Sequence, residues 1–291
     1  MSRTLTVGLD GSPESLAAAE WAAREALLWP AALRAVYAGD QQPSSYRPFA
    51  GEAVAAPGED RAERMLREVR AALTHRHPGL DVTTARLDGR PAAALLEAAR
   101  EADLLVLGSR GLGRAAGHLL GSVAAAVLDR AERPVVLVRA ADDTSDELPA
   151  RDHTGALDGD VVLGLELHDH ADDALLAFAF DAASRRGAAL RIVHGWRLPA
   201  YPDVLSAGTD EREVLDTLLR PWREKYPAVE VTREAVVGGA GPHLVDASRD
   251  AALVVVGRRN RRTAAVGSPI GPVTQEVVRH ALAPVAVVPH D

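Results

Sequence analysis

The 291-residue sequence contains no cysteine and a single lysine, Lys225. The absence of cysteine excludes disulfide bonds and thiolate metal sites, and because it suits a reducing compartment we expect a cytoplasmic protein. No G-x-x-x-x-G-K-[ST] motif occurs, and the one lysine lies far from either glycine-rich loop. The G-x-S-x-G motif of a serine nucleophile is also absent. The sequence therefore predicts neither a P-loop phosphotransferase nor a serine hydrolase of that type.

The sequence also lacks membrane-spanning runs and an excess of positive charge. No apolar run is long enough to cross a bilayer, and the first residues lead directly into a predicted strand rather than a signal peptide. The net charge of −8 leaves no overall surplus of cations for neutralising nucleic-acid phosphates. We therefore expect neither a membrane nor a nucleic acid as a partner.

The most informative stretch that is present runs from Leu104 to Val123. Four apolar residues, Leu104 to Leu107, predict a buried parallel strand, and glycines follow at 108, 111, 113 and 117. Glycine permits a close approach of the backbone that a Cβ would prevent. Gly121-Ser122 then begins an alanine-rich helix, whose N-terminus offers unpaired N–H groups to an anion. The stretch predicts a phosphate-binding loop.

Strands and helices are predicted to alternate through the first half of the chain. Apolar runs predict strands, and apolar residues at helical spacing predict the helices between them. The predicted strands cover residues 4–9, 33–38, 82–87, 104–107 and 135–138. This alternation is typical of a parallel, doubly wound sheet, which binds ligands at the carboxyl ends of its strands. Asp10 and Gly108 are expected at that edge.

The second half repeats the pattern. Residues 141–159 are rich in Asp, Thr, Ser and Pro and predict a linker. Beyond them, apolar strands recur in the same order at 161–165, 190–194, 253–257 and 283–288. A repeat of this length indicates two copies of one domain. The predicted fold class is α/β, with two tandem Rossmann-like, doubly wound domains, each a five-stranded parallel sheet flanked by helices, at residues 1–140 and 160–291.

The glycine spacing in the first half resembles a family motif. Gly108-x-x-Gly111 is followed by nine residues and then by Gly121-Ser122, which is similar to the ATP-binding loop of the universal stress protein family. Further matches are Val7 to Ser15, Gly89-Arg90-Pro91 and Arg133 to Val138. The resemblance covers nearly the whole chain, as a tandem universal stress protein. It implies ATP, with or without Mg²⁺, as the cofactor.

The resemblance also implies the residues of an ATP site in the first half. Asp10, at the end of the first predicted strand, is expected near the adenosine, and Val36, at the end of the second, would contact the adenine through its backbone. The other implied residues precede Asp10 or belong to the glycine loop: Gly8, Leu9, Gly108, Arg110, Gly111, Gly113, His118, Gly121, Ser122 and Val123. For Arg110, Arg114 and His118 a solvated side chain remains an alternative. For Asp10 the alternative is a turn-forming Asp-Gly pair.

The second half departs from this motif. The counterparts of Asp10-Gly11-Ser12 are Glu166-Leu167-His168, Asn260 replaces Gly111, and Pro272 replaces Ser122 after one additional loop residue. Proline removes a hydroxyl and a backbone donor, so we expect little or no ATP in this half. Four arginines concentrate positive charge on the loop, and a polyphosphate or nucleic-acid role stands against a solvated or interface-forming one: Arg258, Arg259, Arg261 and Arg262.

With the resemblance, these observations predict a nucleotide-dependent regulatory protein of the stress response. No catalytic residue and no metal site made of protein ligands are predicted, so we expect at most weak ATPase activity. The alternatives are a slow ATP hydrolase or adenylyl transferase on the same fold, and a ligand-free dimerisation module. A homodimer is expected, and no motif identifies a downstream protein partner.

Each copy ends in an apolar strand, at residues 135–138 and 285–288. The family resemblance implies that these strands lie at sheet edges, and exposed edges favour pairing with another strand. We therefore expect the two copies to pack about an internal pseudo-twofold axis that passes between these strands.

Overall fold

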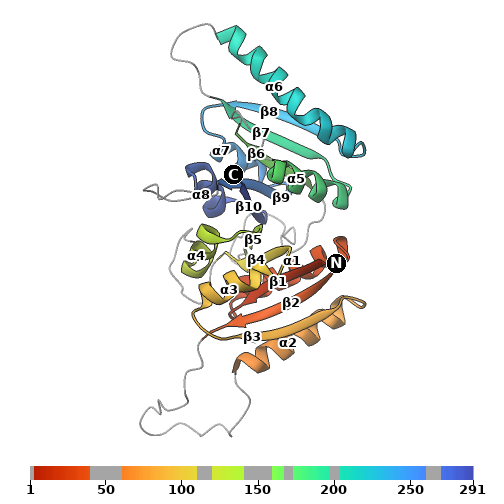
Figure 1. Cartoon of the computed structure of the whole chain (residues 1–291), viewed down its shortest axis with the longest axis vertical. Helices are drawn as coiled ribbons and strands as arrows, with labels where there is room; N and C mark the ends of the chain where they lie inside the picture. The colour runs from red at the N-terminus through yellow and green to blue at the C-terminus, as the bar shows by residue number, and fades with distance from the viewer. Residues whose placement is uncertain are drawn as a thin grey trace, which may run out of the picture.

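The computed structural model describes residues 3–39, 61–109, 120–140, 159–166, 173–196, 204–259 and 270–290, so most of the predicted linker lies outside it. Helices and strands alternate in both halves (Figure 1). The first half contains β1 (Arg3–Leu9), α1 (Pro13–Leu28), β2 (Ala31–Ala38), α2 (Arg61–Arg76), β3 (Val82–Leu87), α3 (Pro91–Arg100), β4 (Leu104–Gly108), α4 (Ser122–Arg130) and β5 (Val135–Val138). The second half contains β6 (Asp160–Leu165), α5 (Asp173–Arg186), β7 (Leu190–Trp196), α6 (Val204–Lys225), β8 (Val231–Val237), α7 (Gly241–Ala247), β9 (Ala251–Arg259), α8 (Pro272–His280) and β10 (Val285–His290).

Local signals in the sequence explain where several helices begin. The Ser12 hydroxyl accepts a hydrogen bond from the Ser15 N–H at 3.2 Å, and Pro13 is the first residue of α1. Pro91 and Pro272 open α3 and α8 in the same way. A proline suits this position because its φ is helical and its missing N–H would have no partner within the helix. The prolines thus mark the first residues of α1, α3 and α8.

The strands form one ten-stranded sheet in the order β3-β2-β1-β4-β5-β10-β9-β6-β7-β8. Within each half the neighbouring strands are parallel. The halves join where β5 pairs antiparallel with β10, with Val136 opposite Ala286 (Figure 1). This confirms the α/β class with two Rossmann-like units, and it confirms that the last strands of the copies meet. The two expected sheets are continuous because β10 completes the backbone hydrogen bonding of the β5 edge.

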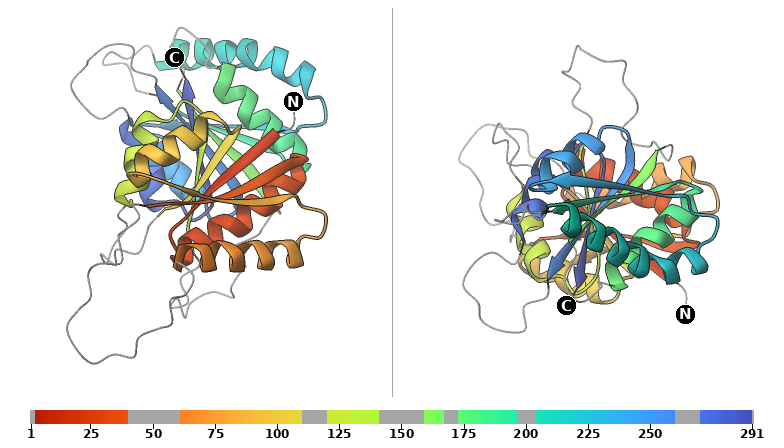
Figure 2. Two further views of the ribbon diagram at one scale, coloured as in Figure 1. Left: turned by 60° about the horizontal axis from the view of Figure 1, so that its bottom comes forward. Right: turned by 90° about the horizontal axis from the view of Figure 1, so that it is seen from above.

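Helices cover both faces of the sheet (Figure 2). On one face, α1, α2, α5 and α6 bury apolar side chains against the strands, and on the other face α3, α4, α7 and α8 do so. Each of these two cores extends through both halves. The core beneath α1, α2, α5 and α6 includes side chains of β1 and β6, and side chains of β5 and β10 contribute to both cores. The halves therefore share their cores as well as their sheet.

An ion pair across the boundary joins α1 to α5. Glu25 of α1 is 2% exposed and binds Arg186, and its carboxylate lies 3.6 Å from Arg185. The Arg185 guanidinium also lies 4.2 Å from the centre of the Trp29 ring. Burial lowers the pKa of Arg185 to about 9, and the charge of Glu25 opposes that shift. The two halves are thus held together by polar as well as apolar contacts.

Candidate functional site

The candidate site lies where β1 and β4 end side by side. These strands pair in parallel, with Val7 opposite Val106, so that Asp10 and Gly108 lie at the same edge of the sheet. On one side of this pair the next strands are β2 and β3, and on the other side the next strand is β5. A doubly wound sheet binds its ligands at such a reversal of strand order. The predicted meeting of Asp10 and Gly108 is therefore confirmed.

Asp10 forms the turn that connects β1 to α1. Its Oδ1 accepts hydrogen bonds from the Ser12 N–H at 2.9 Å and from the Ser12 hydroxyl at 2.6 Å. Gly11 completes the turn with φ of +85°, a conformation that favours glycine. The turn-forming role of Asp10 is thus real, and Oδ2 makes no hydrogen bond within the described part of the chain. One carboxylate oxygen remains available to a ligand.

Gly108 is required for packing against α1, whereas we expected it to let the backbone approach a phosphate. A Cβ at this position would lie 2.8 Å from the carbonyl carbon of Glu14 and 2.9 Å from the Ser15 nitrogen. The end of β4 therefore contacts the backbone of the first turn of α1. Gly8 is also a packing position, because a Cβ there would lie 2.6 Å from Leu107 Cδ2. Both glycines allow the layers to approach one another, whether or not a ligand is bound.

The two ends of the glycine loop are fastened together. The Ser109 N–H donates to the Val138 carbonyl at 2.8 Å, and the Gly121 N–H donates to the Ser109 carbonyl at 3.0 Å. These bonds place the first turn of α4 directly beside the end of β4. Of the predicted loop residues, Gly108, Gly121, Ser122 and Val123 are thus brought to one edge. Arg110, Gly111, Gly113 and His118 lie outside the described residues.

The N-terminus of α4 is open. Gly121 caps the helix in an extended conformation without a side-chain hydrogen bond, and Ser122 is exposed. The first backbone bond of the helix runs from the Ala125 N–H to the Gly121 carbonyl at 2.9 Å. The N–H groups of the preceding turn therefore have no partner within the helix, and with the helix dipole they favour an anion.

Ser109 is a candidate that the sequence did not single out. It is 4% exposed, and its hydroxyl makes no hydrogen bond among the described residues. A buried hydroxyl without a partner is costly, so such groups usually have a protein, water or ligand partner. The only signal in the sequence is a small polar residue directly after Gly108, at the end of a buried strand.

Leu9 and Val36 contribute apolar side chains to the core at this edge. Leu9 is 4% exposed and Val36 is fully buried. The predicted end of the second strand at Ala38 is confirmed, since Ala38 pairs with Leu87 of β3, and Val36 lies two residues before that end. A backbone contact between Val36 and adenine stays a prediction.

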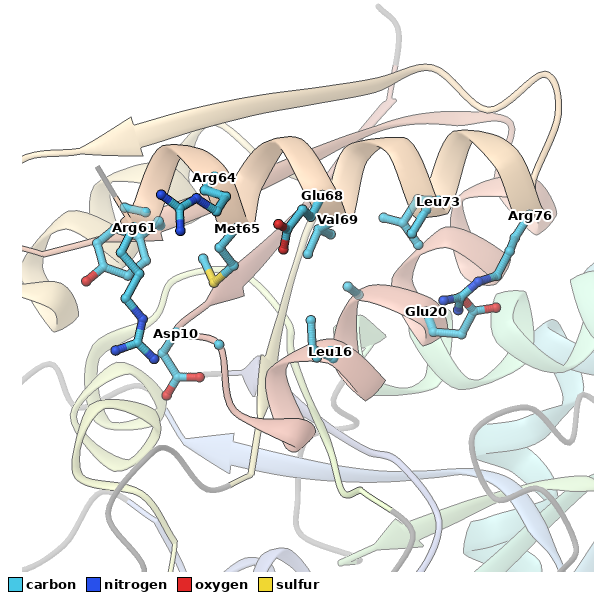
Figure 3. A pocket seen from close by; sticks show the side chains of 15 residues that line it. Asp10, Leu16, Glu20, Arg61, Arg64, Met65, Glu68, Val69, Leu73 and Arg76 are labelled. Carbon is cyan, nitrogen blue, oxygen red and sulfur yellow. The ribbon is translucent and has the colours of Figure 1, made fainter. Parts of the chain in front are cut away.

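A groove of about 640 Å³ opens from Asp10 between α1 and α2 (Figure 3). Leu16 and Met65 face each other across it, and Arg61 points from α2 toward Asp10. Met65 is close enough to Gly11 that a Cβ there would lie 3.3 Å from its sulfur. Sequence reasoning did not connect α2 with this edge, because Arg61 and Met65 lie some fifty residues beyond Asp10.

The far end of the groove is closed by Glu20. Its carboxylate lies 2.9 Å from both Arg76 and His77 of the α2 region and 3.3 Å from Arg24. Burial alone would raise the pKa of the Glu20 carboxyl, but the hydrogen bond with His77 and the nearby positive charges lower it below the ordinary value. The ionised carboxylate therefore holds α1 and α2 together at this end.

At the corresponding edge of the second half, polar groups bond to one another. Glu166, the counterpart of Asp10, lies 3.6 Å from Arg259. The Thr274 hydroxyl of α8 donates to the Gly257 carbonyl at 2.8 Å, where the first half has Ala124. The Gln275 amide donates to the Ile270 carbonyl at 2.9 Å. Several polar groups at this edge thus already have partners within the chain, where a ligand would otherwise bind.

Arg258 does not contribute charge to that edge. It is 5% exposed, and its side chain reaches into the first half. The interface-forming alternative is therefore confirmed for Arg258. Arg261 and Arg262 lie outside the described residues.

Two kinds of feature are absent from the part of the chain that the structure describes. No helix there combines the length and the apolar composition needed to cross a bilayer. No group of three His, Asp or Glu side chains there is arranged to hold a metal ion.

Comparison with known proteins agrees with the motif. The model of the universal stress protein family matches residues 1–139 and 159–289. Universal stress protein Rv2623 of Mycobacterium tuberculosis is 31% identical over 296 residues, which cover 97% of this chain and 95% of the relative. A universal stress protein from Archaeoglobus fulgidus has 17% identity and a TM-score of 0.67, with 100% of both chains covered. A universal stress protein solved in complex with cAMP is 34% identical, with 48% of this chain and 98% of that chain covered and a TM-score of 0.37. The chain belongs to the universal stress protein family, in its tandem form.

Proposed function

We propose that the first half binds ATP at the edge formed by β1, β4 and α4, and that the bound nucleotide regulates contacts with a protein partner during stress. The observation that carries this proposal is the open N-terminus of α4 beside Asp10, at the reversal of strand order. The family resemblance supplies the identity of the nucleotide, since the geometry by itself suits a phosphate ester with a polar group near Asp10.

Each part of the edge has a role in this proposal. The backbone N–H groups of Ser122 and Val123 bind phosphate oxygens, aided by the exposed Ser122 hydroxyl. Asp10 uses its free carboxylate oxygen to accept a hydrogen bond from a ribose hydroxyl. The Ser109 hydroxyl gains a partner in the bound nucleotide. The adenine lies toward the ends of β1 and β2, near Tyr37.

Mg²⁺ fits this arrangement as a companion of the phosphates. Mg²⁺ usually keeps several waters and takes one or two carboxylates together with substrate phosphates. Because the free oxygen of Asp10 is assigned to the ribose, the phosphates and water would supply the ligands of the ion. When bound, the ion would neutralise phosphate charge, and the backbone groups of α4 would still position the chain of phosphates.

We further propose that the chain holds one nucleotide. In the second half, proline at 272 removes a donor, and Glu166 and Gly257 have internal partners. A triphosphate site depends on several charge-assisted hydrogen bonds of about 1.5 to 3 kcal/mol each, so losing two of them weakens binding by about a hundredfold or more.

Turnover is proposed to be slow. Fast hydrolysis needs a group that activates water or stabilises charge at the γ-phosphate. The single lysine, Lys225, lies over the rings of Trp222 and Tyr226 at the end of α6, far from α4 in the fold (Figure 1). We therefore expect a rate far below about 10 per second, the median for enzymes. The protein acts as a nucleotide-dependent regulator, and we propose a homodimer as its assembled form.

Direct measurement of the bound nucleotide tests the proposal. The purified protein is extracted with acid, the extract is analysed by mass spectrometry, and the stripped protein is titrated with ATP, cAMP and adenosine by calorimetry. We expect ATP in the extract and one ATP per chain in the titration. Absence of binding would contradict the proposal, and sustained turnover at about 10 per second would favour the ATP hydrolase instead.

A further inference from the structure

Arg258 reaches from the second half into the first. Its guanidinium donates to the carbonyls of Asp129 and Ala131, at 3.4 Å for Asp129. These carbonyls belong to the C-terminal end of α4, whose N-terminus is the proposed phosphate site. Arg258 directly follows Gly257 in β9, so it is at the start of the loop that corresponds to the glycine loop of the first half.

This contact suits the chemistry of a helix end. The last carbonyls of a helix have no partner within it, and the C-terminus carries partial negative charge. A guanidinium satisfies several carbonyls at once because it presents five N–H donors in a fixed plane. Burial lowers the pKa of Arg258, while the charge of Asp129 raises it. The arginine therefore secures the end of α4 at a position that is almost closed to water.

A second arginine makes the reciprocal contact. Arg139, directly after β5, donates to the carbonyls of Val278 and Arg279 at the end of α8, at 3.2 Å for Val278. Each half thus secures the last helix of the other. The two arginines are not repeats of one position, since Arg139 follows the fifth strand of its half and Arg258 lies in the fourth. The first residue of α4, Ser122, offers an N–H and a hydroxyl, whereas Pro272 at the start of α8 offers neither.

We infer that Arg258 is a positioning residue for the phosphate site, through which the second half regulates the nucleotide affinity of the first. This inference rests on the proposed function. The helix between the two sites has nine residues, a length of about 13.5 Å, and is short enough to move as a rigid body. Its N-terminal end is fastened by the bond between Gly121 and Ser109, and its C-terminal end is fastened by Arg258. Loss of either anchor lets the N–H groups turn away from the phosphates.

The inference predicts different effects on two parts of the ligand, the adenosine and the phosphates. Asp10 and the end of β1 belong to the first half and do not contact Arg258, so binding of the adenosine part should not depend on it. The phosphates bind to the helix, so their contribution should depend on it. A general loss of structure would weaken both parts alike. The ratio of ATP affinity to adenosine affinity therefore separates positioning of the helix from simple destabilisation.

The test compares Arg258→Gln with the matched control Arg139→Gln, using the full chain and calorimetric titration with ATP and with adenosine. We expect Arg258→Gln to weaken ATP by about fivefold or more, since small displacements of positioning groups have large effects, and to leave adenosine unchanged. Arg139→Gln removes the corresponding anchor from the end of α8 in the second half and should change neither affinity. Arg258→Lys keeps the charge without the planar donors, and it serves as the test variant if the glutamine variant does not fold.

Amide exchange at Gly121 and Ala125, whose N–H groups donate to the Ser109 and Gly121 carbonyls at this end of α4, gives a readout that needs no nucleotide. We expect faster exchange there in Arg258→Gln than in the wild type or in Arg139→Gln. Unchanged ATP affinity, or equal losses for ATP and adenosine, would overturn the inference. If the wild type binds no ATP, the proposed function fails, and unchanged exchange in the Arg258 variant would then reject the positioning role separately.

Discussion

The edge between β4 and α4 and the edge between β9 and α8 occupy equivalent places in the two halves, yet their polar groups differ in whether they have partners within the protein. In the first half, the N-terminus of α4 and one oxygen of Asp10 stay open. In the second half, Arg259 faces Glu166 and Thr274 binds the Gly257 carbonyl. In the proposed function the second half keeps the fold without the site, because side chains of the protein make bonds that a ligand would otherwise make.

The largest difference should appear when both strand-end glycines are changed to alanine. In Gly108→Ala the new Cβ meets α1 backbone at 2.8 Å, so we expect a loss of about 3 kcal/mol in the free energy of unfolding. In Gly257→Ala the nearest group is the His290 ring, with Cδ2 at 2.7 Å, which can turn away at a cost of about 1 kcal/mol. Urea unfolding measures both values. Equal losses would contradict the claim that only Gly108 faces rigid backbone.

Proline exchange tests the difference in hydrogen-bond donors. Ser122→Pro keeps the helix, because proline suits the first helical position, but it removes an N–H and a hydroxyl. Losing one charge-assisted hydrogen bond of about 1.5 to 3 kcal/mol should weaken ATP by about tenfold to a hundredfold in calorimetry.

The reverse change, Pro272→Ser, is the matched control. It restores a donor to α8, but Thr274 and Glu166 keep their internal partners. We therefore expect no second nucleotide. A stoichiometry of two for this variant would show that the proline alone closes the second edge.

A smaller effect is expected from neutralising the strand-end carboxylates. Asp10→Asn keeps an oxygen that can accept from Ser12, so the turn survives, while the charge is lost. ATP affinity should fall by about fivefold. Glu166→Gln breaks an exposed pair with Arg259 and should leave ATP affinity unchanged and stability within about 0.5 kcal/mol. A larger effect on ATP from Glu166 than from Asp10 would reverse the assignment of the two halves.

The smallest expected effect is a difference in how the helix contacts of the two halves respond to pH. Glu20 joins α1 to α2 through ion pairs, whereas α5 and α6 are joined by stacked rings of Phe180 and Trp222, 5.9 Å apart. Because folding lowers the pKa of Glu20, its stabilising effect is complete above the ordinary value of 4.5 and is lost as the pH falls through the lowered value. We expect the protection factors of α2 amides, which correct for the intrinsic slowing of exchange in acid, to fall over that range, while those of residues 213–225 of α6 change little.

Glu20→Gln provides the control for the pH experiment. This variant lacks the titrating carboxylate, so exchange in α2 should be faster than in the wild type at neutral pH and should respond less to acid. An equal loss of amide protection in acid for the variant would show that another group controls the contact between α1 and α2.

Much of the fold was predictable because its signals are local. Apolar runs, helical spacing and prolines at helix starts lie within single elements, and the spacing of Gly108 and Gly121 identified the family. The end of β2 at Ala38 was predicted correctly, but its start was placed at Leu33 rather than Ala31, because the pairing of Ala31 with Arg3 depends on another strand. Local patterns specify elements better than they specify where pairing begins.

The contacts that the sequence did not reveal join residues far apart in the chain. Arg258 contacts a helix about 130 residues earlier, and Arg61 faces an edge formed by the first strand. The reason for Gly108 was also missed, since the backbone that it approaches belongs to α1. No spacing rule connects such partners, because the tertiary fold alone brings them together.

The pairing of β5 with β10 has a consequence for how the two halves could diverge. Two separate chains would meet only as often as their concentration allowed, whereas joined copies meet at an effective concentration of about millimolar. A tethered copy can therefore lose its ligand and remain part of the assembly. Because β5 and β10 are already paired, whole chains that associate must use another surface, such as the outer strands β3 and β8 or the helices.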